Sequence, residues 1–133
     1  MIEKRINDYN LFIYHDKNEL SANLSIFIEK QIKELTSLKN RFQLCICGGS
    51  TPRLVYKILS ERNLPWEKVD IFLGDERCVD PKSEDSNTLM VKNTLLKNFG
   101  SKAFFYEIFS NCKIDQALAK QNLLKQLNKK CEG

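Results

Sequence analysis

The stretch FQLCICGGSTPRLVYKIL, residues 42–59, decides the fold. Its first part is short, apolar and β-prone, which predicts a buried strand over Phe42–Cys47. Its last part repeats apolar residues at helical spacing, which predicts a helix from Pro52 to about Glu61. The stretch therefore has the form of a strand, a tight loop of small residues and a helix.

The loop between this strand and this helix has the composition of an anion site. Gly48 and Gly49 allow backbone angles that a Cβ would forbid, and they let a ligand approach the main chain. Ser50 follows, Thr51 is the expected N-cap, and Pro52 suits the first helical position. Free N–H groups and the positive end of the helix dipole then face the loop, which favours phosphate. A plain tight turn is the alternative interpretation.

Strand and helix patterns alternate along most of the chain. Further strands are expected at 11–14 and 69–73, a strand or extended segment at 103–109, and further helices at 17–38, 86–96 and 115–130. Residues 1–8 are expected to be a loose or edge segment. The alternation predicts one α/β domain over residues 1–133, with a mostly parallel, three-layer αβα sheet of Rossmann-like type.

Capping residues mark several of the expected helix ends. Asp16 is the expected N-cap of the first helix, and Glu19 would complete a capping box. Ser86 is the expected N-cap of the helix after the third strand, and Gly100 is expected to mark the end of that helix.

Charged residues follow the strand at 69–73. Arg77 has the geometry to bind a carboxylate or a phosphate, and Asp75 or Glu76 could orient it or accept a proton. A solvated turn with an internal ion pair is the alternative. If the strands at 42–47 and 69–73 are neighbours, both loops open into one crevice, where such sheets bind ligands. Asn87 could contact the ligand there, although a capping role is favoured.

His15 is the only histidine of the chain. It approaches the crevice only if the strand at 11–14 lies beside the strand at 42–47, and a surface turn is the favoured interpretation. Cys45 and Cys47 share one face of their strand and are expected to be buried. The sequence has no metal-ligand spacing, no Ser–His–Asp constellation and no cofactor motif.

Composition narrows the class of function. The formal charge is +4 over 133 residues, and the basic residues form no stripe with interleaved aromatics, which argues against nucleic-acid binding. The start MIEKRINDYN has no apolar core of a signal peptide. No apolar run approaches the roughly 18 residues of a membrane span. A cytoplasmic protein is therefore expected.

With these residues in place, the chain resembles the 6-phosphogluconolactonase family, which shares its fold with glucosamine-6-phosphate isomerases/deaminases. The matching segments are residues 48–52, 54–56, 75–79 and 86–87, together with Trp66, Phe72, Met90, Leu95 and Leu96. Their order and spacing fit from about residue 10 to residue 130. Arg77 favours the lactonase, because an aromatic residue usually takes its place in the deaminase branch, where the loop is typically Gly-Gly-Thr-Pro.

The resemblance implies hydrolysis of 6-phospho-glucono-1,5-lactone to 6-phosphogluconate, in the oxidative pentose phosphate pathway, without a metal or an organic cofactor. The loop Gly48–Thr51 would hold the substrate phosphate, with Asn87 beside it. Arg77 would bind substrate or stabilise the developing oxyanion, and Asp75 would help to shape the site.

The resemblance also implies a missing part. Family members continue with a Gly-x-Gly-x-Asp-Gly-His segment that carries the general base, and His15 does not match that histidine in position. We therefore expect an N-terminal portion of the family fold that is inactive alone. An open sheet edge would promote self-association or binding of a separate C-terminal half. The alternatives are an isomerase/deaminase-like enzyme and a non-catalytic phosphosugar-binding module.

Overall fold

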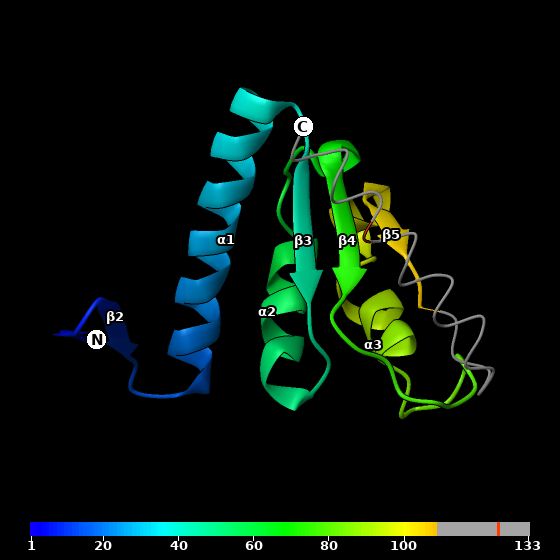
Figure 1. Ribbon diagram of the computed structural model, residues 1–133, viewed down its shortest axis with the longest axis horizontal. Helices are drawn as coiled ribbons and strands as arrows, with labels where there is room; N and C mark the ends of the chain where they lie inside the picture. The colour runs from blue at the N-terminus through cyan, green and yellow to red at the C-terminus, as the bar shows by residue number, and fades with distance from the viewer. Residues whose placement is uncertain (109–124, 126–133) are drawn as a thin grey trace.

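A parallel sheet and the helices packed on it form the body of the protein in the computed structural model (Figure 1). The structure describes residues 1–108 and residue 125. The sheet has the order β3-β4-β5, and its strands are β3 Phe42–Ile46, β4 Val69–Leu73 and β5 Phe104–Tyr106. The helices are α1 Lys17–Lys39, α2 Ser50–Ser60 and α3 Asn87–Thr94, with 3₁₀ helices η1 Trp66–Lys68 and η2 Asn98–Lys102. A separate antiparallel hairpin precedes α1 and consists of β1 Ile2–Ile6 and β2 Tyr9–Ile13.

The hydrophobic core lies between one face of the sheet and the helices. Every residue of β4 is buried, as expected for a central strand of a parallel sheet that is covered on its faces. Trp66 is 0% exposed and its indole N–H donates to the carbonyl of Arg62 at 2.9 Å. The core cluster consists of Ile32, Ile46, Val55, Tyr56, Leu59, Leu64, Trp66, Val69, Ile71, Leu73, Met90, Val91, Leu95 and Ile108.

One ion pair ties the strands together on the other face of the sheet. The guanidinium of Arg41, the residue before β3, donates through Nε to Asp70 Oδ2 at 2.9 Å and through Nη2 to Asp70 Oδ1. The Asp70 carboxylate is 7% exposed, so its charge needs this partner. The same guanidinium lies over the ring of Phe104, 5.2 Å from its centroid. Arg41 thereby links β3 to both other strands.

The parallel α/β architecture predicted from the sequence is confirmed. The strand expected at 69–73 has those bounds, and the strand expected at 42–47 ends one residue earlier. Asp16 caps α1 as expected, since its Oδ1 accepts the N–H of Glu19 at 2.8 Å. The carboxylate of Glu19 binds the N–H of His15 rather than that of Asp16, so the capping box is not closed. The helix expected at 115–130 lies outside the described residues.

Several local predictions differ from the structure. Of the two alternatives for residues 1–8, a loose or an edge segment, the edge segment is observed, because Ile2–Ile6 forms a strand that pairs with Tyr9–Ile13. The strand expected at 11–14 is present with shifted bounds, Tyr9–Ile13, and it pairs with β1 and not with β3. The helix capped by Ser86 ends at Thr94, and Gly100 lies inside η2.

The expected burial of Cys45 and Cys47 is wrong, because both residues are exposed. Cys45 lies on β3, at one edge of the described sheet and on the face away from the core cluster. Cys47 follows that strand, and its thiol lies 3.9 Å from the Tyr56 hydroxyl. The partial burial that remains raises the pKa of the Cys45 thiol, and the nearby Cys47 adds to that effect.

Removal of the Arg41 guanidinium will destabilise the sheet. Arg41→Ala leaves the buried Asp70 carboxylate without its charged donors, and hydrogen bonds to charged groups contribute about 1.5–3 kcal/mol each. We expect the free energy of unfolding, measured in urea, to fall by about 2 kcal/mol. Arg62→Ala, on an exposed side chain after α2, is the control and should change it by less than about 0.5 kcal/mol. Equal stabilities of the two variants would contradict the role given to Arg41.

Candidate functional site

The carboxyl ends of β3 and β4 bring the two predicted loops to one end of the sheet. The strands are parallel neighbours in the register Ile46↔Leu73. The N–H of Gly74 extends this pairing by donating to the carbonyl of Ile46 at 2.9 Å. The Gly-Gly loop after β3 and the acidic and basic residues after β4 therefore leave the sheet side by side. This confirms that the strands are neighbours, the condition on which a shared crevice was predicted.

Asn87 joins the two loops. A Cβ built on Gly48 would lie 2.0 Å from Asn87 Oδ1 and 2.5 Å from its Cγ, so the carboxamide occupies the space of a side chain at position 48. The same carboxamide donates through Nδ2 to the carbonyl of Asp75 at 3.2 Å and to Asp75 Oδ1 at 3.4 Å. Three of the predicted site residues, Gly48, Asp75 and Asn87, are thus in one cluster.

Glu76 binds the amino end of α3. Its Oε1 accepts the N–H of Asn87 at 2.7 Å and that of Arg77 at 2.8 Å. Its Oε2 accepts the N–H of Thr88 at 2.8 Å and the hydroxyl of Ser86 at 3.1 Å. Partial burial raises the pKa of Glu76, but the N–H donors of Thr88, Asn87 and Arg77 outweigh it, so the pKa lies below its usual value. Glu76 is an ionised structural carboxylate.

The sequence hypothesis for the Asp-Glu-Arg triplet is only partly supported. Glu76 contacts the main chain of Arg77 and not its guanidinium. Within the described residues the Arg77 side chain is exposed and forms no salt bridge. Asp75 is also exposed. The described contacts therefore do not orient Arg77, and its guanidinium lies in solvent beyond the end of β4.

The amino end of α2 is open for an anion. Helix α2 begins at Ser50, with Gly49 at φ 104° as its N-cap, and no side chain caps it. The prediction that Thr51 is the N-cap is therefore wrong, because the positive φ of Gly49 already turns the chain into the helix. Ser50 and Thr51 are exposed, and the first turn has no acidic residue. Its N–H groups and dipole face solvent without a competing carboxylate.

Tyr56 fixes the main chain of Cys47, the residue between β3 and Gly48. Its hydroxyl donates to the carbonyl of Cys47 at 2.8 Å and accepts the N–H of Cys47 at 3.2 Å. Burial, followed by its contacts with Cys47, raises the pKa of Tyr56 above its ordinary value. The hydroxyl therefore stays protonated and fixes the residue that precedes Gly48. A single tyrosine in a helical pattern gave no signal for this role.

Cations also border the start of α2. Lys17, at the start of α1, donates through Nζ to the carbonyl of Ser50 at 3.1 Å. Arg53 lines an open groove of about 630 Å³ between α2, α3 and the loop at Glu84 and Asp85. Neither residue was predicted from the sequence. Arg53 could have been suspected from its position, because it lies in the first helical turn after the loop of small residues. Lys17 could not, because its contact joins residues that are 33 positions apart in the sequence.

His15 does not join this cluster. It lies between β2 and α1, its side chain is exposed, and its main-chain N–H donates to Glu19. The strand before it pairs with β1 only, so the arrangement that could bring it to the crevice is absent from the described sheet. The favoured interpretation as a surface histidine is consistent with this placement.

None of the described helices is both long and apolar enough to cross a membrane. No group of three or more His, Cys, Asp or Glu side chains is arranged to hold a metal ion in the part of the chain that the structure describes.

Comparison with known proteins gives a consistent set of matches. Residues 15–132 match the family model of glucosamine-6-phosphate isomerases/6-phosphogluconolactonase. A 6-phosphogluconolactonase of Xylella fastidiosa is 34% identical over 113 residues, which cover 85% of this chain and 47% of that protein. One from Rhizobium meliloti is 30% identical and covers 83% of this chain and 47% of that protein. The chain spans about half the length of the curated relatives that it matches.

Solved structures match over a similar share of the chain. A 6-phosphogluconolactonase from Shewanella baltica has a TM-score of 0.76 and 30% identity, over 84% of this chain and 48% of that one. The Trypanosoma brucei 6-phosphogluconolactonase has a TM-score of 0.70 and 28% identity, over 89% of this chain and 50% of that one.

The close fit of Gly48 against Asn87 predicts a strong coupling between the two positions. Gly48→Ala forces the Asn87 carboxamide away from Asp75, so we expect a loss of stability of about 1–3 kcal/mol. In the Asn87→Ala background the carboxamide is absent, so Gly48→Ala should lower the free energy of unfolding by much less. A double-mutant cycle measured by urea unfolding tests this. Additive effects of the two substitutions would contradict the described packing.

Glu76 predicts a specific dependence of stability on pH. Its pKa is lower in the folded protein, so its contribution is full above the unfolded pKa of about 4.3. That contribution is lost as pH falls through the folded value. We expect Glu76→Gln to be less stable near neutral pH by about 1–2 kcal/mol, as for loss of a helix cap. Urea unfolding from pH 7 to pH 3 should show the difference shrinking. A difference that stays constant would rule out the ionised cap.

Proposed function

Because the chain belongs to the glucosamine-6-phosphate isomerase/6-phosphogluconolactonase family, we propose that it forms the phosphate-holding half of a lactone hydrolase. Its substrate would be 6-phospho-glucono-1,5-lactone. Water adds to the lactone carbonyl, the bond from that carbon to the ring oxygen breaks, and 6-phosphogluconate is the product. The observation that carries the proposal is the meeting of Gly48, Asp75 and Asn87 next to the open amino end of α2.

The substrate phosphate would lie at the start of α2. There the N–H groups of the first turn and the hydroxyls of Ser50 and Thr51 can donate to its oxygens. Lys17 and Arg53 supply positive charge nearby, which favours a dianion through its longer-range attraction. Gly48 and Gly49 keep the backbone accessible to the ligand.

The sugar end of the substrate would extend toward the end of β4. Arg77 has an exposed guanidinium there, and its planar set of donors suits a carboxylate product or a developing oxyanion. Asp75 is held in place through its main chain by Asn87 and would shape the pocket. Glu76 is excluded as the proton acceptor because four hydrogen bonds occupy its carboxylate.

No residue of this chain is proposed to activate water. We propose that the general base comes from the half of the family domain that lies outside the matched region, so the chain alone should not hydrolyse the lactone appreciably. Self-association or a separate C-terminal half are the proposed partners. A cytoplasmic location stays a prediction from the sequence.

The second candidate is a non-catalytic phosphosugar-binding module, which the open start of α2 and the exposed Arg77 would also serve. An isomerase or deaminase on the same fold is less favoured, because every relative and structure cited above is described as a 6-phosphogluconolactonase. The hydrolase and the binding module differ in one measurement, the hydrolysis of freshly generated lactone by the chain together with its complementary half.

Titration calorimetry with 6-phosphogluconate tests the site itself. We expect the unmodified chain to bind the ligand, and Arg77→Ala to weaken binding about tenfold to a hundredfold, the loss of one or two charge-assisted hydrogen bonds. Arg62→Ala removes the same charge at the opposite end of α2 and is the matched control, with unchanged affinity. Absence of binding by the unmodified chain would refute the site, and hydrolysis by this chain alone above the spontaneous rate would refute the assignment of the base.

A further inference from the structure

The β1–β2 hairpin has one apolar face. Side chains of a strand alternate between its two faces, and the register pairs Ile2 with Ile13, Lys4 with Leu11, and Ile6 with Tyr9. These six side chains share one face, which we call the hairpin face. The opposite face carries the pairs Glu3 with Phe12 and Arg5 with Asn10. The hairpin is therefore amphipathic, with a single lysine on its apolar side.

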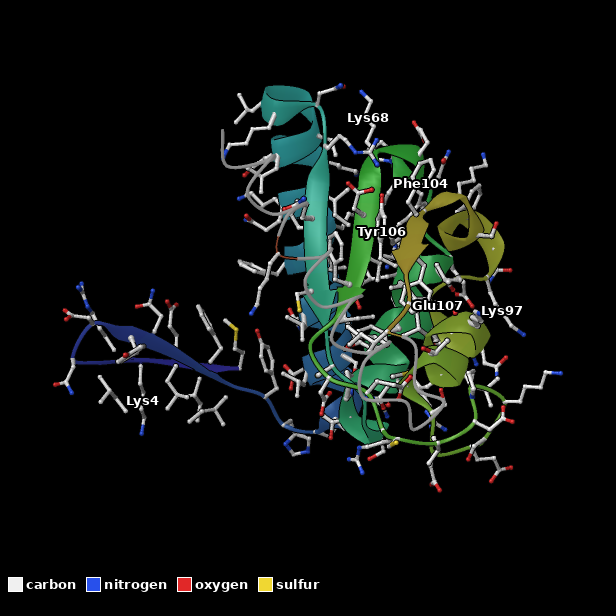
Figure 2. The ribbon with its side chains drawn as sticks, turned by 45° about the vertical axis from the view of Figure 1, so that its right-hand side comes forward. Lys4, Lys68, Lys97, Phe104, Tyr106 and Glu107 are labelled. Carbon is white, nitrogen blue, oxygen red and sulfur yellow. The ribbon has the colours of Figure 1, made fainter. Side chains whose placement is uncertain are left out.

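The hairpin face is exposed in the protein. Its five apolar side chains are exposed by 55%, 53%, 77%, 41% and 40% at Ile2, Ile6, Tyr9, Leu11 and Ile13. The hairpin projects away from the body, with Lys4 on the projecting part (Figure 2). An isolated two-stranded hairpin is marginally stable in water, and a contiguous exposed apolar patch marks an interaction site.

We propose that the hairpin face is the docking surface for the complementary half of this family's domain. This rests on the proposed function, which needs that half for catalysis. The chain matches only 47% of the Xylella fastidiosa relative and 48% of the Shewanella baltica structure. In those proteins a comparable length of chain must pack against the matched half, and the hairpin face is an apolar surface that the described elements leave uncovered.

Charge favours this occupant over a second copy of the chain. The chain has a formal charge of +4, so two copies repel each other. Lys4 lies opposite Leu11, within the hairpin face. If the hairpin faces of two copies packed together, two ammonium groups would be buried among apolar side chains. Neither hairpin face carries an acidic residue to pair with them. A segment that brings apolar side chains and one carboxylate for Lys4 meets both requirements.

A groove connects the hairpin to the candidate phosphate loop. It has a volume of about 430 Å³ and is open to solvent. Its lining residues are Phe12, Ile13, Tyr14, Asp16, Lys17, Leu20 and Thr51. Ile13 belongs to the hairpin face and Thr51 to the loop. A segment docked at the Ile13 end of the face would therefore lie beside the proposed phosphate site, where a residue it carries could reach the substrate.

Co-expression tests the docking surface. The probe is the part of the Xylella fastidiosa 6-phosphogluconolactonase outside its matched 113 residues, expressed as a separate tagged polypeptide with residues 1–133 of this chain. We expect the two to co-purify. Leu11→Lys puts an unpaired charge into the interface and should weaken binding about tenfold or more. Asn10→Lys adds the same charge on the opposite face and is the matched control, with unchanged binding.

The outcomes separate the possible occupants. No co-purification, or equal loss in Leu11→Lys and Asn10→Lys, overturns the proposal. A homodimer seen by sedimentation of the unmodified chain and abolished by Leu11→Lys assigns the face to a second copy and overturns it as well. Circular dichroism checks that the variants fold, and Ile6→Ser provides a second, uncharged substitution on the same face, for which weaker binding is expected.

The binding readout is independent of the proposed activity. Co-purification without hydrolysis of the lactone would retain the docking surface and refute the hydrolase. Hydrolysis that requires the complementary half but is unaffected by Leu11→Lys would retain the hydrolase and refute the docking surface.

Discussion

The site depends on one steric constraint, the carboxamide of Asn87 in the space where position 48 would place a side chain. The contact joins the loop after β3 to the start of α3, and the hydrogen bond from Asn87 to the carbonyl of Asp75 adds the end of β4. Three segments that are distant in the sequence thus meet at one side chain. The relative positions of these segments are well defined, because Asn87 is itself fixed. Its main-chain N–H donates to Glu76, and the residue is only 8% exposed.

The parts of this arrangement that were predictable from sequence are those that local patterns specify. The apolar runs of β3 and β4 have glycines at their carboxyl ends, and the alternation with helices implied parallel neighbours. Their shared edge then followed from topology, with Gly48, Asp75 and Asn87 as its residues. Arg77 was found by its type and position, but its partners in a complete site were not.

The parts that were missed depend on contacts between distant residues or on competition between neighbours. Glu76 reaches ten to twelve residues ahead to α3, a distance that no local capping rule covers. Gly49 at positive φ starts α2 before Thr51 can cap it. The hairpin had a usable signal, since Asn7, at φ 52°, lies with Asp8 between two alternating segments, as in two-residue β-turns. The exposure of Cys45 follows from the position of β3 at an edge of the described sheet, which composition does not encode.

The two helix starts at this edge of the sheet differ in the origin of their counter-charge. Helix α3 has an internal one, the Glu76 carboxylate, so dissolved ions hardly affect its positive end while that carboxylate is ionised. Among the described residues no side chain caps α2 and no acidic residue lies in its first turn, so dissolved ions can balance its positive end. Sulfate or phosphate in a buffer will therefore compete at α2 and leave α3 untouched, and added salt will weaken the attraction for a sugar phosphate. Buffer composition is thus part of the chemistry of this site.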